Sequence, residues 1–105
     1  MLEHDALYHM KQMYLMVHRA ISQVGISMQG GHASARAKEI LIRQRVPEEE
    51  AVLAISLYSA VGFSLHMKIV SENPSEEWLP LFTEDLWTVL HNVHPTFGQL
   101  RVLYT

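Results

Sequence analysis

Apolar residues recur at helical spacing through the first quarter of the chain. They alternate in steps of three and four residues: Leu7, Met10, Tyr14, Val17, Ile21, Val24 and Met28. This heptad spacing predicts a helix with one continuous apolar seam. The pair Gly30-Gly31 that follows favours a turn, because glycine adopts turn conformations without strain. We therefore predict a first helix over residues 3–28.

A proline at position 47 ends one predicted helix and opens the next. Because the residue before a proline is biased away from helical angles, we predict a second helix from residue 33 or 34 to Arg45. Pro47 suits a first helical turn, and the three glutamates after it suit the positive end of a helix dipole. The apolar stretch that follows predicts a single third helix that reaches Val70. It is apolar on nearly every face, which is typical of a central helix covered on several sides.

Shorter elements complete the chain. Cap, proline and acidic positions over 73–76 predict a short helix limited by Pro80, and residues 83–85 begin another that ends at His94-Pro95. We assign the tail, residues 96–105, to a helix, because its alternating apolar residues would otherwise form one strand without a partner. The sequence therefore predicts an all-α fold: a single-domain bundle of four to five helices over residues 1–105, with a central apolar helix.

Composition narrows the class of protein. The chain has 105 residues, of which 49% are hydrophobic and 18% charged, so it is long and apolar enough for one folded core. It contains no cysteine, which excludes disulfides and thiolate metal ligands. The first residues lack the pattern of a signal peptide, and the longest uncharged apolar run, 51–65, is shorter than the about 20 residues that span a bilayer. We therefore expect no membrane association and a cytoplasmic location.

The first predicted helix carries more apolar surface than its seam. Four further residues lie beside the seam: Tyr8, Met13, Leu15 and Met16. Either two neighbouring helices cover this surface, or it meets another chain. Methionine side chains suit a partner surface because they are flexible. Our leading hypothesis is a small non-enzymatic interaction protein, such as an inhibitor, an immunity or antitoxin-like protein or an adaptor, which binds another protein or forms a homodimer through this face.

Basic residues border the second predicted helix. Arg36 and Arg43 lie on one flank of its apolar stripe, where they could add to a protein-binding surface, and Lys38 and Arg45 lie on the other. The same arrangement suits a phosphate backbone, so a dimeric nucleic-acid-binding regulator is an alternative. The intramolecular explanation is pairing with nearby glutamates. The net charge of −3 argues against nucleic acid as the partner.

The seven histidines are the remaining candidates for chemistry. His91 and His94 are three residues apart on a predicted helix, which permits two ligands to one divalent metal, so a metal-binding or small-ligand-binding bundle is a second alternative. His18 lies on the edge of the first helix, where protonation below about pH 6 would gather charge, and His66 is interpreted as a satisfied core residue. The motifs of hydrolases, phosphate loops and dinucleotide sites are absent, so we predict no enzymatic activity and no cofactor.

Overall fold

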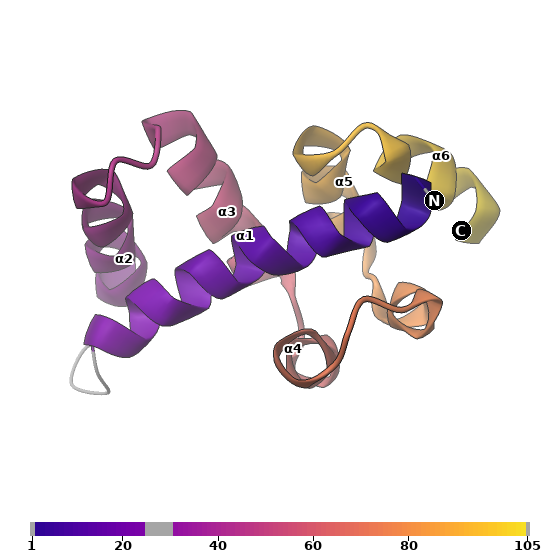
Figure 1. Cartoon of the computed structure of the whole chain (residues 1–105), viewed down its shortest axis with the longest axis horizontal. Coiled ribbons are helices and arrows are strands. Elements are labelled where there is room, and N and C mark those ends of the chain that lie inside the picture. Colours follow the sequence, from indigo (N-terminus) through magenta and orange to yellow (C-terminus); the bar gives the residue numbers. More distant parts are fainter. Residues whose placement is uncertain (1, 25–30, 105) are drawn as a thin grey trace.

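The computed structural model describes residues 2–24 and 31–104, and these residues are organised in helices (Figure 1). The elements are α1 (Leu2–Val24), α2 (Gly31–Arg43), α3 (Glu48–Ala60), α4 (Phe63–Ser71), the 3-10 helix η1 (Glu76–Leu81), α5 (Glu84–Val93) and α6 (Thr96–Tyr104). The all-α prediction is confirmed. The described residues contain more helices than the four to five predicted, because the third predicted helix is divided in two and the segment around Pro80 is a helix of its own.

The central position belongs to α1 rather than to the third predicted helix. It crosses the whole molecule, with α2 and α3 toward its C-terminal end and α5 and α6 toward its N-terminal end (Figure 1). The seam is buried in the interior: Leu7, Met10, Tyr14 and Val17 are each at most 1% exposed. The heptad pattern is therefore used within one chain. The predicted end of this helix at Met28 lies outside the described residues.

The apolar stretch 48–70 is not one helix, as the sequence led us to predict. The chain bends by 118° between α3 and α4, at Val61 and Gly62. The bend returns Leu65 and Ile69 of α4 to the core, where they are buried. Both halves of the apolar stretch therefore contribute to one core.

Local capping accounts for the other helix ends. α2 stops two residues earlier than predicted, because Arg45 adopts a left-handed conformation with φ of 67° and the N–H of Val46 donates to the carbonyl of Leu41. The hydroxyl of Thr83 accepts from the N–H of Leu86, 3.2 Å away, and begins α5 where the sequence predicts it. The predicted helix in the tail is confirmed as α6.

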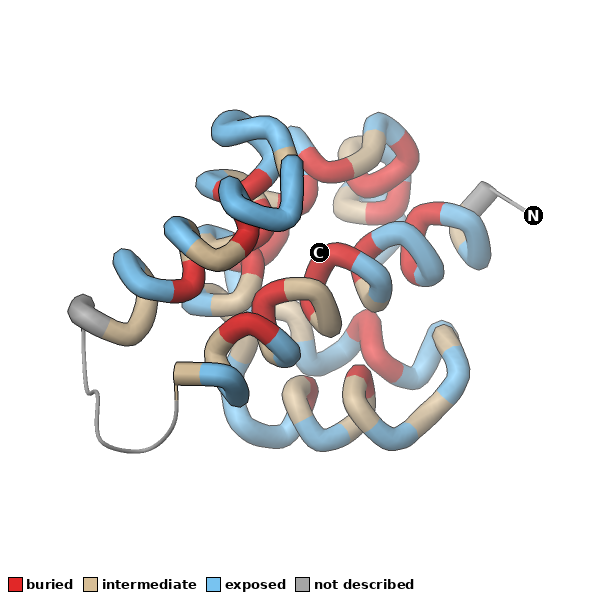
Figure 2. Tube along the Cα trace, turned by 60° about the vertical axis from the view of Figure 1, so that its left-hand side comes forward, coloured by how far each residue is buried: buried red, intermediate tan, exposed pale blue. Residues whose placement is uncertain are grey.

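Buried side chains from these helices form one continuous core (Figure 2). Small residues allow close approach between α2 and α3: Ala37 on α2 and Ala51 and Ala54 on α3 are fully buried. Larger side chains fill the other end, including Trp78 of η1, Trp87 of α5 and Phe97 of α6. The indole N–H of Trp78 is a buried donor that has no hydrogen-bond partner among the described residues.

Candidate functional site

The interaction surface predicted on the first helix is largely covered. Met13 is only 4% exposed and belongs to the core, Leu15 and Met16 are half-buried, and Met16 packs against the core. Tyr8 alone of these four is clearly exposed, at 55%. The assignment of Met13 to a partner surface was wrong, because helices packed on α1 cover this side chain.

The basic residues of α2 lie on the surface, as predicted, and part of their charge is paired within the chain. Arg36 donates to the carboxylate of Glu39 at 2.7 Å, and Lys38 pairs with Glu48 of α3 at 3.1 Å. Arg43 is exposed at the end of α2. Exposed ion pairs of this kind contribute little to stability. They nevertheless reduce the positive field that a phosphate backbone would meet.

The two histidines predicted to share a metal are not presented as a pair on one helix. His94 caps the end of α5 in an extended conformation, and its Nδ1 accepts a hydrogen bond from the N–H of Thr96 at 3.2 Å. His91 is exposed on α5 beside Gly98 of α6. No group of three or more histidines, aspartates or glutamates within the described ranges is placed to hold a metal ion. His94 remains one turn after His91, since its N–H donates to the carbonyl of Leu90, but its Nδ1 is engaged by the backbone, and metal binding by this pair stays a prediction.

The structure brings together four other polar rings, Tyr14 and His18 of α1, Tyr58 of α3 and His66 of α4, which we call the Tyr–His cluster. The hydroxyl of Tyr14 and Nδ1 of His66 share a hydrogen bond, and Nδ1 of His18 lies 3.3 Å from the hydroxyl of Tyr58. The two tyrosine rings are stacked with their centroids 4.7 Å apart, and the two imidazoles meet edge to face at 5.3 Å. Each imidazole therefore contacts a tyrosine and the other imidazole.

Burial favours the neutral forms of the Tyr–His cluster. The ring of Tyr14 is 1% exposed, and the other three residues are half-buried. Burial raises the pKa of Tyr14, with a smaller contribution from Tyr58, and burial also raises the pKa of Tyr58. Burial lowers the pKa of His18, and the nearby His66 and Arg19 lower it further. The tyrosines and His18 are thus neutral at neutral pH.

An apolar stripe lies on the outer face of α4, next to the Tyr–His cluster. Phe63 is 78% exposed and Met67, one turn later, is 47% exposed, while Leu65 and Ile69 on the opposite face are buried. Val70, one further turn along, is half-buried and packs against the core. We call Phe63 and Met67 the α4 stripe. The ring of Phe63 stacks on that of His66 with centroids 6.4 Å apart, so the stripe adjoins the cluster directly.

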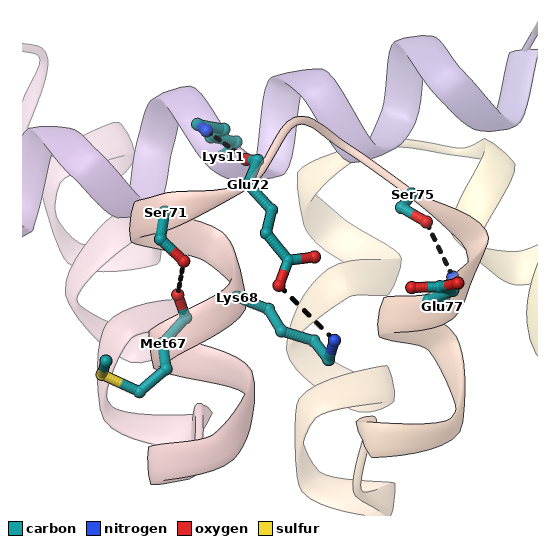
Figure 3. A network of polar contacts seen from close by, with 7 residues as sticks. All are labelled: Lys11, Met67, Lys68, Ser71, Glu72, Ser75 and Glu77. Atoms are coloured by element: carbon teal, nitrogen blue, oxygen red, sulfur yellow. Dashed lines mark hydrogen bonds and ion pairs between the residues drawn. The ribbon is translucent and has the colours of Figure 1, made fainter.

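Polar contacts fasten the C-terminal end of α4 to α1 (Figure 3). The ammonium of Lys11 donates to the backbone carbonyl of Glu72, the residue that caps α4. The carboxylate of Glu72 pairs with Lys68 at 3.5 Å. The hydroxyl of Ser71 donates to the carbonyl of Met67 one turn earlier. α4 is thus held to α1 at its end by Lys11 and near its middle by His66.

A pocket of about 400 Å³ lies between the N-terminal end of α1 and the segment before η1. It is lined by Glu3, His4, Leu7, Pro74, Ser75 and Glu76. A hydrogen bond between the carboxyl groups of Glu3 and Glu76, aided by burial and by their mutual repulsion, raises the pKa of Glu3. The two acids therefore interact chiefly with each other.

No pattern in the sequence indicates the Tyr–His cluster as a unit. Tyr14 belongs to the predicted seam, His18 to its edge, and His66 to the apolar third helix, where its interpretation as a satisfied residue agrees with its hydrogen bond to Tyr14. The bonded pairs are separated by 52 and 40 residues. Packing of α3 on α1 brings Tyr58 to Tyr14 and His18, and the bend between α3 and α4, which was not predicted, adds His66.

The chain matches no protein-family model, no curated protein and no solved structure. No single described helix has both the length and the apolar character to cross a membrane, and α3 and α4 meet these requirements only as a pair bent by 118°. The α4 stripe and the Tyr–His cluster are therefore the features from which we infer a function.

Proposed function

We propose that the chain is a small non-enzymatic protein–protein interaction module that binds a partner protein through the α4 stripe. The observation that carries the proposal is the exposure of Phe63 and Met67, 78% and 47%, on one face of a short helix. Apolar side chains one turn apart are the anchors by which a helix enters the groove of a partner, and aromatic anchors contribute most to such binding. The sequence hypothesis placed the partner-binding surface on α1, and we now propose that it lies on α4.

The α4 stripe is favoured over the other exposed apolar residues by its geometry. Val102 and Leu103 of α6 are 81% and 75% exposed, but adjacent residues on a helix point about 100° apart. Phe63 and Met67 are four residues apart and therefore point in nearly the same direction. The flexible thioether of Met67 can adjust its shape to the partner beside the rigid ring of Phe63. α4 thus supplies a continuous contact, whereas the end of α6 supplies two divergent ones.

The charge around α4 suggests the chemistry of the partner. From residue 61 onward the chain contains two basic residues and five acidic ones, including Glu72, Glu76 and Glu77 on or beside α4. Charges on the rim of an interface steer partners of opposite sign. We therefore propose an apolar groove with a basic rim on the partner. We also propose a cytoplasmic location. That compartment is reducing, and a chain without cysteine does not depend on disulfides for its stability.

Site-specific photo-crosslinking in the organism that makes the protein tests the proposal. A photoreactive phenylalanine analogue replaces Phe63, and in a matched control it replaces Val52, which is 45% exposed on α3. We expect a discrete adduct with one protein from position 63 and none from position 52. Mass spectrometry identifies the partner, and an adduct of twice the mass of the chain would identify a second copy.

A charge in the α4 stripe provides the second half of this test. Met67→Glu places a carboxylate at the proposed interface, and because Met67 is 47% exposed we expect its effect on thermal unfolding to stay within about 0.5 kcal/mol. The adduct from position 63 should then disappear. An adduct that survives in a folded Met67→Glu variant, or the same set of adducts from positions 63 and 52, would show that α4 is not the interface.

A further inference from the structure

We propose that the Tyr–His cluster makes the docking of α4 on α1 depend on pH, so that acidification releases α4 and changes how the α4 stripe is presented. This regulatory role rests on the proposed function, because the stripe is the surface proposed to bind the partner. The docking itself is a property of the isolated chain. Three features support the proposal: a hydrogen bond that protonation reverses, two facing imidazoles without an acidic partner, and a helix with few neighbours.

The hydrogen bond between Tyr14 and His66 requires a neutral imidazole. The phenol of Tyr14 is buried, and Nδ1 of His66 is its hydrogen-bond partner within the described residues. Because buried hydroxyl protons are satisfied in native structures, Tyr14 donates and Nδ1 of His66 accepts, which places the ring proton on Nε2. A protonated imidazole has an N–H at both positions and cannot accept. Protonation of His66 therefore leaves the buried O–H of Tyr14 without an acceptor.

The two imidazoles face each other across the boundary between α1 and α4. Their centroids are 5.3 Å apart, so two charged rings would repel each other directly. Within the described ranges no carboxylate forms an ion pair with either ring. The charged neighbour on α1 is Arg19, itself a cation, and α3 contributes the neutral phenol of Tyr58. The Tyr–His cluster therefore contains no negatively charged group that would compensate the charge of a protonated imidazole.

The charged groups near α4 are engaged elsewhere. On α4 itself, Lys68 is paired with Glu72 (Figure 3). On η1, which also contacts α4, Glu76 is hydrogen-bonded to Glu3, and Glu77 is exposed next to Ser75. These acids therefore do not replace the missing counterion of His18 and His66.

α4 is the element that can move to separate the imidazoles. It has nine residues and packs chiefly on α1 and η1, whereas α3 packs on α1, α2 and α5. It is joined to α3 through the extended residues Val61 and Gly62, and apart from the chain neighbours no atom of the described residues lies within 4 Å of the position of a Cβ at Gly62. Elements with few buried contacts open at the lowest cost in free energy. Local release of α4 is therefore favoured over unfolding of the whole chain.

The direction of the effect follows from His18. Its pKa is lowered from the ordinary 6.5, chiefly by burial, so the docked state binds protons less readily than a released one. This contribution to stability is fully present above about pH 6.5 and is lost as the pH falls through the lowered pKa of the docked state. Docking is thus expected above neutrality and release in the mildly acidic range.

Amide hydrogen exchange of the chain without a partner measures this release. Protection factors for the amides of α4 and α3 are compared at pH 7.5 and pH 5.5, after correction for the intrinsic exchange rates. We expect protection in α4 to fall severalfold more than protection in α3, because the docked state binds protons less readily than the released state. An equal change in the two helices, or none in α4, would overturn the proposal.

A double variant and a matched control separate this switch from other effects of acid. In the double variant His18→Asn and His66→Asn, the asparagine amide lies near the position of Nδ1 and does not titrate, and the helix propensities of the two residue types are similar. We expect α4 of this variant to show no selective loss of protection at pH 5.5. The matched control His91→Asn, at an exposed histidine of α5, should behave like the wild type.

The wild-type histidine signals keep the test decisive if the double variant does not fold. In an NMR titration, the ring protons of His18 should share their midpoint with the amide shifts of α4. Separate midpoints for His18 and α4 contradict the switch. Because neither measurement needs a partner, the switch can fail while crosslinking from position 63 succeeds, and the converse result would refute the proposed function alone.

Discussion

α3 and α4 arise from one apolar stretch of the sequence but occupy different environments. α3 packs on α1, α2 and α5, with Ala51, Ala54 and Leu57 fully buried. α4 packs chiefly on α1 and η1 and leaves Phe63 exposed. Apolar composition therefore does not by itself determine burial. Burial also depends on how many helices surround the segment, and that number depends on where the chain bends.

The difference separates a structural helix from one suited to binding. The small residues of α3 permit close approach of its neighbours, since the distance between packed helices depends on the side chains at the contact. α4 buries two side chains and relies on Lys11 and His66 for its polar attachment to α1. A helix held by few contacts can change position without loss of the core. Four substitutions, three at the sites proposed to differ and one matched control, test this comparison.

The largest effect is expected from Leu57→Ala in α3. Leu57 is fully buried, so the substitution removes apolar contacts and leaves a cavity. We expect the free energy of unfolding, measured by urea denaturation, to fall by about 3 kcal/mol. The matched control Val52→Ala, at a side chain 45% exposed on the same helix, should change it by less than about 0.5 kcal/mol. Similar losses in both variants would mean that α3 is not the tightly packed helix described above.

An intermediate and local effect is expected from Tyr14→Phe. The substitution keeps the buried ring and removes the hydroxyl that binds His66, so α4 should lose about 1 kcal/mol of docking free energy at pH 7.5. Hydrogen exchange should show this loss in the amides of α4 and not in those of α3. If α3 loses protection to the same extent, the hydrogen bond stabilises the whole core rather than the attachment of α4.

The smallest effect, and a stabilising one, is expected from Gly62→Ser. Gly62 has φ of −79° and ψ of 169°, which serine adopts readily, and the space for a Cβ is open. The serine hydroxyl can cap α4, which now has no side-chain cap, and serine is less flexible than glycine in the unfolded chain. We expect a gain of about 0.5 kcal/mol, seen as a higher denaturation midpoint. A loss of stability would instead show that the bend requires glycine.

Short-range signals predicted much of the secondary structure. Thr83 begins α5 and Pro47 immediately precedes α3, because caps and prolines act on residues within one turn. The break before α4 carried no comparable signal: Gly62 has a negative φ that any residue can adopt. The break lets both halves of the apolar stretch pack on α1, which is a contact between residues far apart in the sequence.

The candidate sites were harder to predict than the helices. The sequence identified Met13 as apolar but not which neighbours cover it, and it placed His91 and His94 one turn apart without indicating that Nδ1 of His94 accepts a hydrogen bond from the backbone of Thr96. The rings that do meet, such as Tyr14 and His66, are 52 residues apart. Side chains so far apart carry no periodic relation, so only the fold defines their contact.

The sequence alone determined that this protein is all-α, where most of its helices begin, and that the seam of the first helix is apolar. These properties depend on interactions between residues a few positions apart. The tertiary structure decided that α1 is central, that the apolar stretch bends between α3 and α4, and that the Tyr–His cluster lies beneath the exposed stripe of α4. These outcomes depend on the space left by the other helices, and no local segment encodes that space.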